Sequence, residues 1–141
     1  MNLILSRDQY EDMVGDVVEN LPAEACGLLG GVEGRVVRVH PVENALHSPF
    51  AYSMEPQRQV EAMLSLEREG LELLAIYHSH PSGPPTPSAS DVSQAYYPDS
   101  LYVIVAPGKA GEFQARAFQI TEERVSEVEL SVEGLRLVGC D

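Results

Sequence analysis

The sequence is poor in cysteine and lacks tryptophan. Its 141 residues include two cysteines, Cys26 and Cys140. Two cysteines are too few for a disulfide framework, and they do not show the close pairing of a cysteine-based zinc site. We therefore expect Cys26, which lies in an apolar run, to be a small buried hydrophobic residue rather than a nucleophile. Cys140 is expected to be exposed or disordered at the chain end.

Basic residues are also scarce. Lysine and arginine together number 9 against 22 aspartate and glutamate residues, which gives a formal net charge of −13 at pH 7. An acidic surface repels phosphate backbones, and no run of lysine and arginine offers a local basic patch. We therefore expect no nucleic-acid binding. The charge either favours a basic partner or is simply a solvated surface.

Long apolar runs are missing as well. No segment approaches the ~18 apolar residues that span a bilayer, so we expect no membrane association. The N-terminal segment turns polar and acidic after five residues, unlike a signal peptide, and we expect a cytoplasmic protein. The length suits a single domain, residues 1–141, and the 44% hydrophobic content is enough for a core.

Hydrophobic periodicity divides the chain into helices and strands. The predicted helices are 8–20, 56–69 and 88–97, and the predicted strands are 25–31, 35–42, 71–80, 101–106, 112–120 and a last edge strand at 125–132. Two pairs of neighbouring strands are expected to form hairpins, 25–31 with 35–42 and 101–106 with 112–120. These hairpins among helices indicate an α/β (α+β) domain with a mixed sheet. Residues 45–55 form either a short strand or an extended loop, and the tail after Gly134 is hard to place.

The segment HSHPSGPPTPSASD, from His78 to Asp91, carries the chemistry. His78 and His80 end a predicted strand one residue apart, so both side chains point to the same face. Asp91 follows eleven residues after His80, beyond a proline-rich loop. Two imidazoles, one carboxylate and an open fourth position are typical of a catalytic zinc, which lowers the pKa of a bound water to about 7. The stretch from Ser88 to Asp91 also has the form of a helix capping box, and both interpretations can hold together.

This segment resembles the H-x-H-x(7)-S-x-x-D signature of the JAMM (MPN-plus) zinc metalloproteases, with no position missing. The family also has a P-x-E-x-C-G motif, which residues 22–27 match, followed by an apolar segment. The two motifs occur in the family's order, about fifty residues apart. The resemblance covers about Leu3 to Val132. It implies the cytidine-deaminase-like JAMM/MPN fold, a curved mixed β-sheet flanked by helices.

The resemblance implies a role for each of five residues. His78, His80 and Asp91 would bind Zn²⁺. Glu24 would be the general base that takes a proton from the zinc-bound water and passes it to the leaving amine. Ser88 would donate a hydrogen bond to the oxyanion of the tetrahedral intermediate. Spacing alone would instead make Glu24 an exposed acid in a loop.

The substrate also follows from the resemblance. Family members hydrolyse the peptide or isopeptide bond after the C-terminal Gly-Gly of ubiquitin or ubiquitin-like proteins. This short chain is most similar to the small bacterial and archaeal members, so the implied partner is a ubiquitin-like or sulfur-carrier protein ending in Gly-Gly. A narrow tail of this kind suits a groove beside the zinc. Asn44 and residues 48–50 would line the groove.

Other functions stay open. The same site could serve a RadC-like or cell-wall-peptide zinc hydrolase of the superfamily. The acidic charge argues against the first, and the lack of a signal or partner domain argues against the second. The domain could also be a non-catalytic MPN interaction module, against which the intact set of five residues argues. A homodimer is possible.

Overall fold

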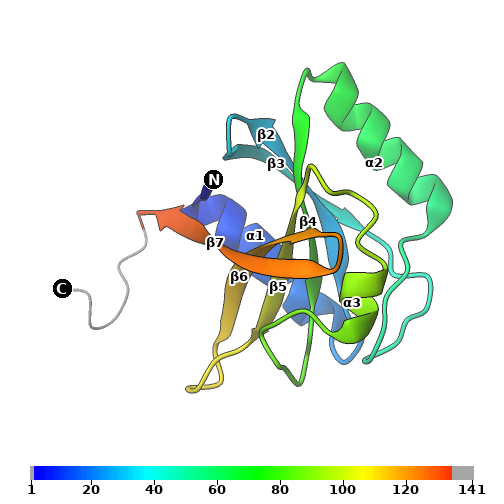
Figure 1. The fold of residues 1–141 in the computed structure, drawn as a ribbon, viewed down its shortest axis with the longest axis vertical. Coiled ribbons are helices and arrows are strands. Elements are labelled where there is room, and N and C mark those ends of the chain that lie inside the picture. Colours follow the sequence, from blue (N-terminus) through cyan, green and yellow to red (C-terminus); the bar gives the residue numbers. More distant parts are fainter. Residues whose placement is uncertain (1, 135–141) are drawn as a thin grey trace.

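The computed structural model describes residues 2–134 and confirms most of the predicted segments (Figure 1). Its helices are α1 (Arg7–Asn20), α2 (Pro56–Arg68) and α3 (Ala89–Ser93). Its strands are β1 (Asn2–Ser6), β2 (Cys26–Val32), β3 (Arg35–Val42), β4 (Glu72–Ser79), β5 (Leu101–Pro107), β6 (Phe113–Thr121) and β7 (Arg124–Glu133). Both predicted hairpins are present, because β2 pairs with β3 and β5 with β6, each antiparallel. The predicted mixed sheet flanked by helices is therefore confirmed.

The strands form one curved, closed sheet in the order β1-β3-β2-β4-β5-β6-β7. β4 is central, as expected, and pairs antiparallel with β2 and parallel with β5. β1 closes the ring by pairing parallel with β7 along its whole length and meeting β3 at Ile4. The prediction of an edge strand at 125–132 is wrong, because β7 lies between β6 and β1. β1 itself was not predicted, since five residues are too short to show a clear period.

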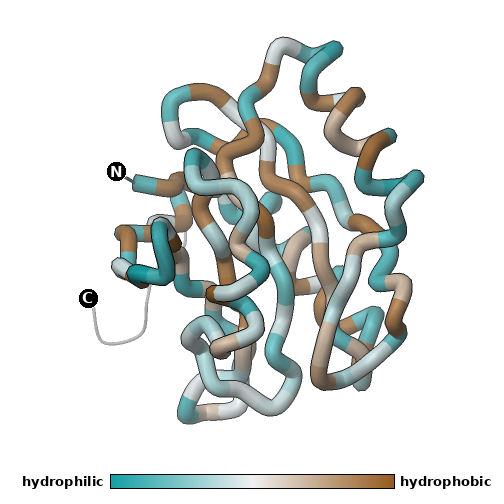
Figure 2. The backbone as a smooth tube through the Cα atoms, turned by 45° about the vertical axis from the view of Figure 1, so that its right-hand side comes forward, coloured by the Kyte–Doolittle hydropathy of each residue, from teal (hydrophilic) through white to brown (hydrophobic). Residues whose placement is uncertain are grey.

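The central strands are buried on both faces. Successive residues of each strand point to opposite sides of the sheet, so each strand contributes to two separate cores. One core joins Leu29 of β2, Tyr77 of β4 and Val105 of β5 to Met13 and Val17 of α1. The other joins Leu28, Ile76 and Ile104 of the same strands to Ala62 and Leu66 of α2. Two-sided burial explains the nearly continuous apolar runs in these strands, which appear brown in Figure 2.

The two long helices begin and end at the residues that the sequence indicates. Ser6 and Gln9 form a capping box at the start of α1. Pro56 occupies the first turn of α2, and Gly70 follows its end with a φ of 72°, a conformation that glycine adopts readily. Among residues 2–134, no helix has the length and apolarity needed to cross a membrane.

α3 is shorter than the predicted helix 88–97. It ends at Ser93, and the following backbone is not helical. Pro98 disfavours a helical conformation at Tyr97, and the Tyr97 N–H donates instead to the Tyr102 hydroxyl at 3.0 Å. Gln94 and Tyr96, which follow the shorter helix, border the site described next.

Candidate metal centre

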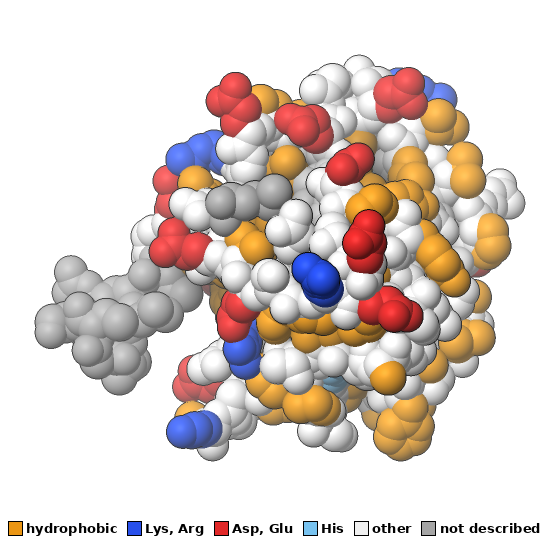
Figure 3. Space-filling view, in the orientation of Figure 1, with side chains coloured by type: hydrophobic (Ala, Val, Ile, Leu, Met, Phe, Trp, Pro, Cys, Tyr) orange, Lys and Arg blue, Asp and Glu red, His pale blue; other side chains and the backbone are white. Residues whose placement is uncertain are grey.

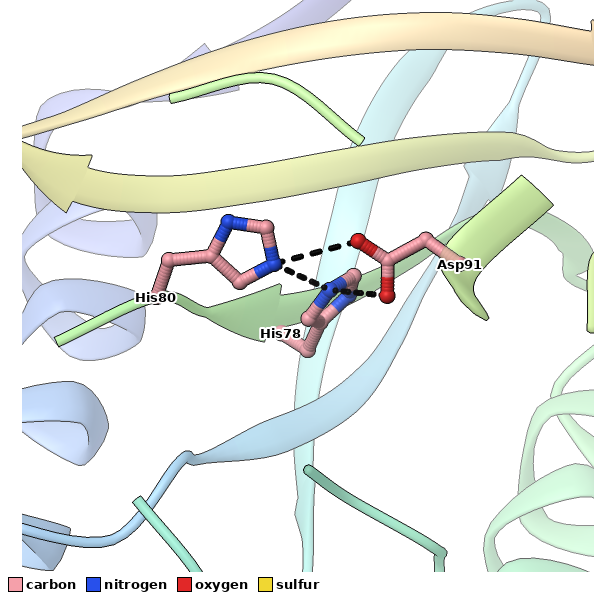
Figure 4. A group of neighbouring side chains, drawn as sticks. All are labelled: His78, His80 and Asp91. Atoms are coloured by element: carbon pink, nitrogen blue, oxygen red, sulfur yellow. Dashed lines mark hydrogen bonds and ion pairs between the residues drawn. The ribbon is translucent and has the colours of Figure 1, made fainter. Parts of the chain in front are cut away.

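Three side chains predicted as ligands converge on one point (Figure 4). β4 carries His78 at its end, on the same face as Ile76, and His80 follows two residues later on that face. The Nε2 atoms of His78 and His80 lie 3.2 Å apart. The Asp91 carboxylate places one oxygen 3.1 Å from His78 Nε2 and the other 3.1 Å from His80 Nε2. The structure therefore brings together the residues that the sequence predicted as ligands.

The start of α3 holds Asp91 in position. Ser88 is the N-cap, and its Oγ accepts a hydrogen bond from the Asp91 N–H at 3.0 Å. The Ser88 N–H in turn donates to Asp91 Oδ2 at 2.8 Å. The predicted capping box is thus confirmed, and the same carboxylate also faces the histidines. Because Ser88 Oγ is an acceptor in the cap, its own proton stays available for another acceptor.

Other contacts orient the two imidazoles. His80 Nδ1 lies 2.7 Å from the Pro84 carbonyl oxygen, so an Nδ1–H donates there and Nε2 is the ring nitrogen that faces Asp91 and is left to bind a metal. The ring of Tyr52 stacks on His78 with a centroid distance of 4.5 Å. His78 Nδ1 is buried and has no hydrogen-bond partner within residues 2–134. Sequence reasoning missed the role of Tyr52, because a single aromatic residue in a loop does not reveal which ring it will contact.

The protonation states suit a metal site. Burial lowers the pKa of His78, which keeps this imidazole neutral. Burial opposes ionisation of Asp91, but hydrogen bonds from both histidines outweigh it and hold the pKa of Asp91 well below its usual range. Burial would also lower the pKa of His80, but its contacts with Asp91 and the Pro84 carbonyl raise it. A metal would displace the proton of His80, because ligands bind in their deprotonated form.

The spacing of the three donors fits a zinc ion. Two ligand atoms 2.0–2.1 Å from a tetrahedral zinc are about 3.3 Å apart. The corresponding donor atoms here are 3.1 and 3.2 Å apart. Imidazole nitrogen and carboxylate oxygen are also the donors of catalytic zinc sites, in which three protein ligands leave one position open.

Pairing between β2 and β4 brings a fourth residue toward the cluster. Cys26 lies opposite His78 in the antiparallel ladder. One residue further, the Ser79 N–H donates to the Ala25 carbonyl at 3.0 Å, and the Ala25 N–H donates to Ser79 Oγ at 2.8 Å. Continuing this register places Glu24 opposite His80. Ser79 was not predicted to have this role, which depends on the register between two strands.

Glu24 is buried at the site rather than exposed in a loop. Its side chain is only 5% exposed, and it lines the same cavity as His80, Ser88 and Asp91. Burial raises the pKa of Glu24 to about 7; the Asp91 carboxylate adds to this rise, and His80 opposes it. A carboxyl group with a pKa near neutrality can both accept and return a proton. The interpretation of Glu24 as an exposed acid is therefore wrong.

A cavity of about 560 Å³ opens beside the cluster. The loop between β3 and α2 forms one side of it. Of the predicted residues 48–50, Pro49 and Phe50 line the cavity, but Ser48 does not. Three exposed apolar side chains border the cavity: Leu46, Phe50 and Tyr96, which are 53%, 85% and 75% exposed. We call these three residues the apolar rim. Figure 3 shows apolar side chains gathered on the side of the molecule where α2, α3 and this loop lie.

Asn44 does not line the cavity, which corrects the prediction. It is buried, and its side chain holds the loop together from within. Its Nδ2 donates to the carbonyls of Glu24 and Ala51 at 3.0 and 3.1 Å. Its Oδ1 accepts from the N–H groups of Leu46 and Ser53, both at 3.1 Å. Asn44 therefore ties the loop that carries the apolar rim to the backbone of the catalytic candidate Glu24.

Cys26 is fully buried, as predicted, and has no nucleophilic character. Its Sγ lies 3.3 Å from the Val42 carbonyl oxygen, and burial raises the pKa of its thiol to about 12. A thiol with so high a pKa supplies almost no thiolate near neutral pH. Cys140 lies outside the described residues.

The curved mixed sheet, with a His-His-Asp cluster at the end of its central strand, defines a domain of the JAMM/MPN class. Comparison with known families agrees, because residues 6–121 match the prokaryotic homologs of the JAB domain. The chain belongs to this family.

Relatives and solved structures extend this result. The desampylase of Pyrococcus furiosus is 35% identical over 83% of this chain and 81% of its own length. The CysO-cysteine peptidase of Mycobacterium tuberculosis is 33% identical over 92% of this chain and 90% of its own. A solution structure from Desulfitobacterium hafniense has a TM-score of 0.83 at 33% identity and covers 100% of this chain and 99% of its own. A JAB1/MPN domain protein of Archaeoglobus fulgidus has a TM-score of 0.61 at 19% identity, covering 92% and 98%. The predicted JAMM/MPN fold and the prediction of an enzyme of the peptidase type are confirmed.

Proposed function

We propose that this protein is a zinc-dependent peptidase or isopeptidase that cleaves the bond after the C-terminal Gly-Gly of a ubiquitin-like or sulfur-carrier protein. The observation that carries the proposal is the convergence of His78, His80 and Asp91 at one point, with the buried acid Glu24 lining the same cavity as His80 and Asp91. The relatives named desampylase and CysO-cysteine peptidase support the substrate class.

His78, His80 and Asp91 would hold the zinc ion through the three converging donors. A zinc ion bound there supplies Lewis acidity, which polarises a scissile carbonyl and makes water more acidic. The contacts that orient these ligands are already in place: Pro84 on His80, Tyr52 on His78, and the capping box around Asp91. Such outer contacts fix ligand direction and strengthen metal binding.

Glu24 would move the proton. Its carboxylate takes a proton from the attacking water, and the resulting carboxylic acid passes that proton to the departing amine nitrogen. A pKa of about 7 suits both transfers near neutral pH. The hydrogen bonds between Ala25 and Ser79 hold the backbone beside Glu24 against the strand that carries the histidines.

Ser88 would stabilise the developing negative charge. Its hydroxyl lines the cavity, and the oxygen is already engaged as an acceptor in the cap of α3. The hydroxyl proton is therefore free to point at the oxyanion that forms on the scissile carbonyl. A single donor of this kind contributes roughly 10²–10³-fold to the rate of amide hydrolysis.

The apolar rim would contact the body of the carrier protein while its Gly-Gly tail occupies the cavity. Exposed apolar side chains grouped around a cavity mouth are typical of a recognition surface. The same cavity could serve a RadC-like or cell-wall-peptide hydrolase, but the activities named for the relatives favour a carrier protein. A non-catalytic interaction module would not need a buried acid at a metal cluster.

Metal analysis combined with single substitutions tests the proposal. We expect one equivalent of zinc per chain by mass spectrometry, lost in His78→Ala and Asp91→Ala because each removes a ligand. Glu24→Gln should keep the zinc but reduce cleavage of a Gly-Gly-linked carrier by roughly 10²–10⁴-fold, since it cannot accept a proton. A chelator should abolish activity, and added zinc should restore it.

His40→Ala is the matched control, because His40 lies on β3 outside the cavity. It should retain both zinc and activity. A zinc-loaded protein that cleaves no Gly-Gly-linked carrier of its host would refute the substrate, and a protein that binds no metal would support the interaction module instead.

A further inference from the structure

We propose that this site selects leaving groups without a free carboxylate next to the scissile bond. The preferred leaving group is then an isopeptide-linked lysine or a continuing peptide chain, not a single C-terminal amino acid. The inference rests on the proposed function and narrows it to one class of conjugate.

The walls of the cavity would not accept a carboxylate well. Among the described residues that line it, none is lysine or arginine, and two are the acids Glu24 and Asp91. The wall beyond the cluster is neutral, with Ser90, Gln94 and Tyr96 among its residues. A single amino acid released from the tail would place its carboxylate within a few bonds of the scissile nitrogen, and therefore inside this cavity. A carboxylate placed there would face these two acids without a cationic side chain to pair with, which is unfavourable.

The metal would be only a weak partner for that carboxylate. Asp91 and the ionised fraction of Glu24 would offset much of the charge of a divalent ion held at the cluster. At longer range, the formal net charge of −13 disfavours any further anion that approaches the site. A leaving group that ends in a carboxylate is thus disfavoured both by the acids that line the cavity and by the field of the whole molecule.

A second, smaller cavity adjoins the first and is suited to a hydrocarbon chain. Its volume is about 140 Å³, and it shares Tyr52, Ser53, Gln94 and Tyr96 with the larger cavity. All the residues that line it are uncharged, and Met54, Ile76, Tyr97 and Tyr102 are among them. The methylene stem of an isopeptide-linked lysine carries no charge, since its nitrogen is part of the amide. Such a stem can pack against aromatic and aliphatic walls.

The test compares substrates with and without this charge, and the first two differ in nothing else. Each small ubiquitin-like protein of the host that ends in Gly-Gly is extended by semisynthesis with one alanine, as the free acid or as alaninamide. A third version carries Gly-Gly on the Nε of Nα-acetyl-lysinamide. With zinc-loaded protein near neutral pH, where the terminal carboxyl is ionised, we expect kcat/KM for both uncharged versions to exceed that of the free acid at least tenfold. Added salt should narrow the difference, because it screens the repulsion.

A charge placed in the cavity provides the second arm. Gln94→Lys should favour the free acid and so reduce the ratio of kcat/KM for the alaninamide substrate to kcat/KM for the free-acid substrate at least threefold. Gln57→Lys adds the same charge at an exposed position of α2 outside the cavity, and it should leave the ratio unchanged. A wild-type ratio near one or below overturns the inference but leaves the proposed function standing. Failure to cleave any of the three versions refutes the proposed function, and the inference falls with it.

Discussion

At the residue scale, Glu24 shows how one environment can serve catalysis and oppose stability. Its carboxyl group is buried next to Asp91, and its pKa is raised from 4.5 to about 7. A raised pKa means that the folded state holds the proton more tightly than the unfolded chain does. Folding stability associated with this group is therefore fully present below about pH 4.5 and is lost as the pH rises through about 7.

Glu24→Gln is accordingly expected to stabilise the metal-free protein at alkaline pH, although it reduces the activity of the zinc-loaded protein. Glutamine cannot ionise, so the variant avoids the cost of burying a charge. Urea denaturation should show a higher free energy of unfolding than wild type at about pH 8, and the gain should shrink toward zero at about pH 4.5. Glu19→Gln, at an exposed position of α1, is the control and should show no such gain. A difference between Glu24→Gln and wild type that does not vary with pH would contradict the raised pKa.

At the element scale, α3 is only five residues long, yet the helix and its N-cap supply Asp91 and Ser88 to the site. A helix of this length is not stable by itself, because the unfavourable free energy of nucleation exceeds the stabilisation that one turn of hydrogen bonds provides. Its position depends on the capping box between Ser88 and Asp91. The same hydrogen bonds that begin the helix also fix the carboxylate that faces the histidines.

Ser88→Ala should therefore affect both stability and catalysis. Loss of the cap is expected to reduce the free energy of unfolding by about 1 kcal/mol. Loss of the oxyanion donor should reduce kcat by roughly 10²-fold. Ser88→Thr retains a hydroxyl, so both its free energy of unfolding and its kcat should be close to those of the wild type. Denaturation curves and steady-state kinetics measure the two effects separately.

Ser6→Ala is the matched control for this experiment. Ser6 forms the same kind of capping box at α1, away from the cavity. It should show a similar loss of stability with kcat unchanged. If Ser88→Ala changes stability alone, Ser88 is a helix cap only and does not act on the oxyanion.

At the scale of the whole molecule, the two ends of the described chain hold the sheet closed. β1 lies between β3 and β7, and Leu3 and Leu5 from β1 are completely buried in the core that α1 covers. On the face seen in Figure 3, acidic side chains are spread over the surface and outnumber the basic ones. A homodimer, the absence of nucleic-acid binding and a cytoplasmic location stay predictions.

Leu5→Ala should destabilise the entire fold, including the distant metal site. Removing a fully buried leucine side chain is expected to lower the free energy of unfolding by about 2–5 kcal/mol. Unfolding followed by circular dichroism and by zinc release should give the same midpoint, because the closed sheet unfolds as one unit. Leu64→Ala, at a position of α2 that is 43% exposed, should cost much less. Separate midpoints would show that the site survives opening of the sheet.

Part of this protein could be predicted from the sequence alone, because the signals are local. The period of the apolar residues located most strands and both long helices. The spacing of His78, His80 and Asp91 predicted the three side chains that converge as candidate metal ligands, since alternate strand residues share a face and a capping box fixes the start of a helix. The resemblance to JAMM proteases added Glu24 and Ser88, which line one cavity with His80 and Asp91 in the structure.

The rest was decided only by tertiary structure, because it depends on contacts between distant segments. The register of β2 against β4 turns Glu24 from a loop acid into a buried group with a pKa of about 7. The stacking of Tyr52 on His78 and the burial of Asn44 arise only when the loop before α2 packs against the sheet. Pairing of β1 with β7 converts an expected edge strand into the closure of the ring. Residue spacing along the chain does not reveal which groups lose contact with water or which distant strands pair. Desolvation sets the pKa of Glu24 at the site, and long-range strand pairing closes the sheet.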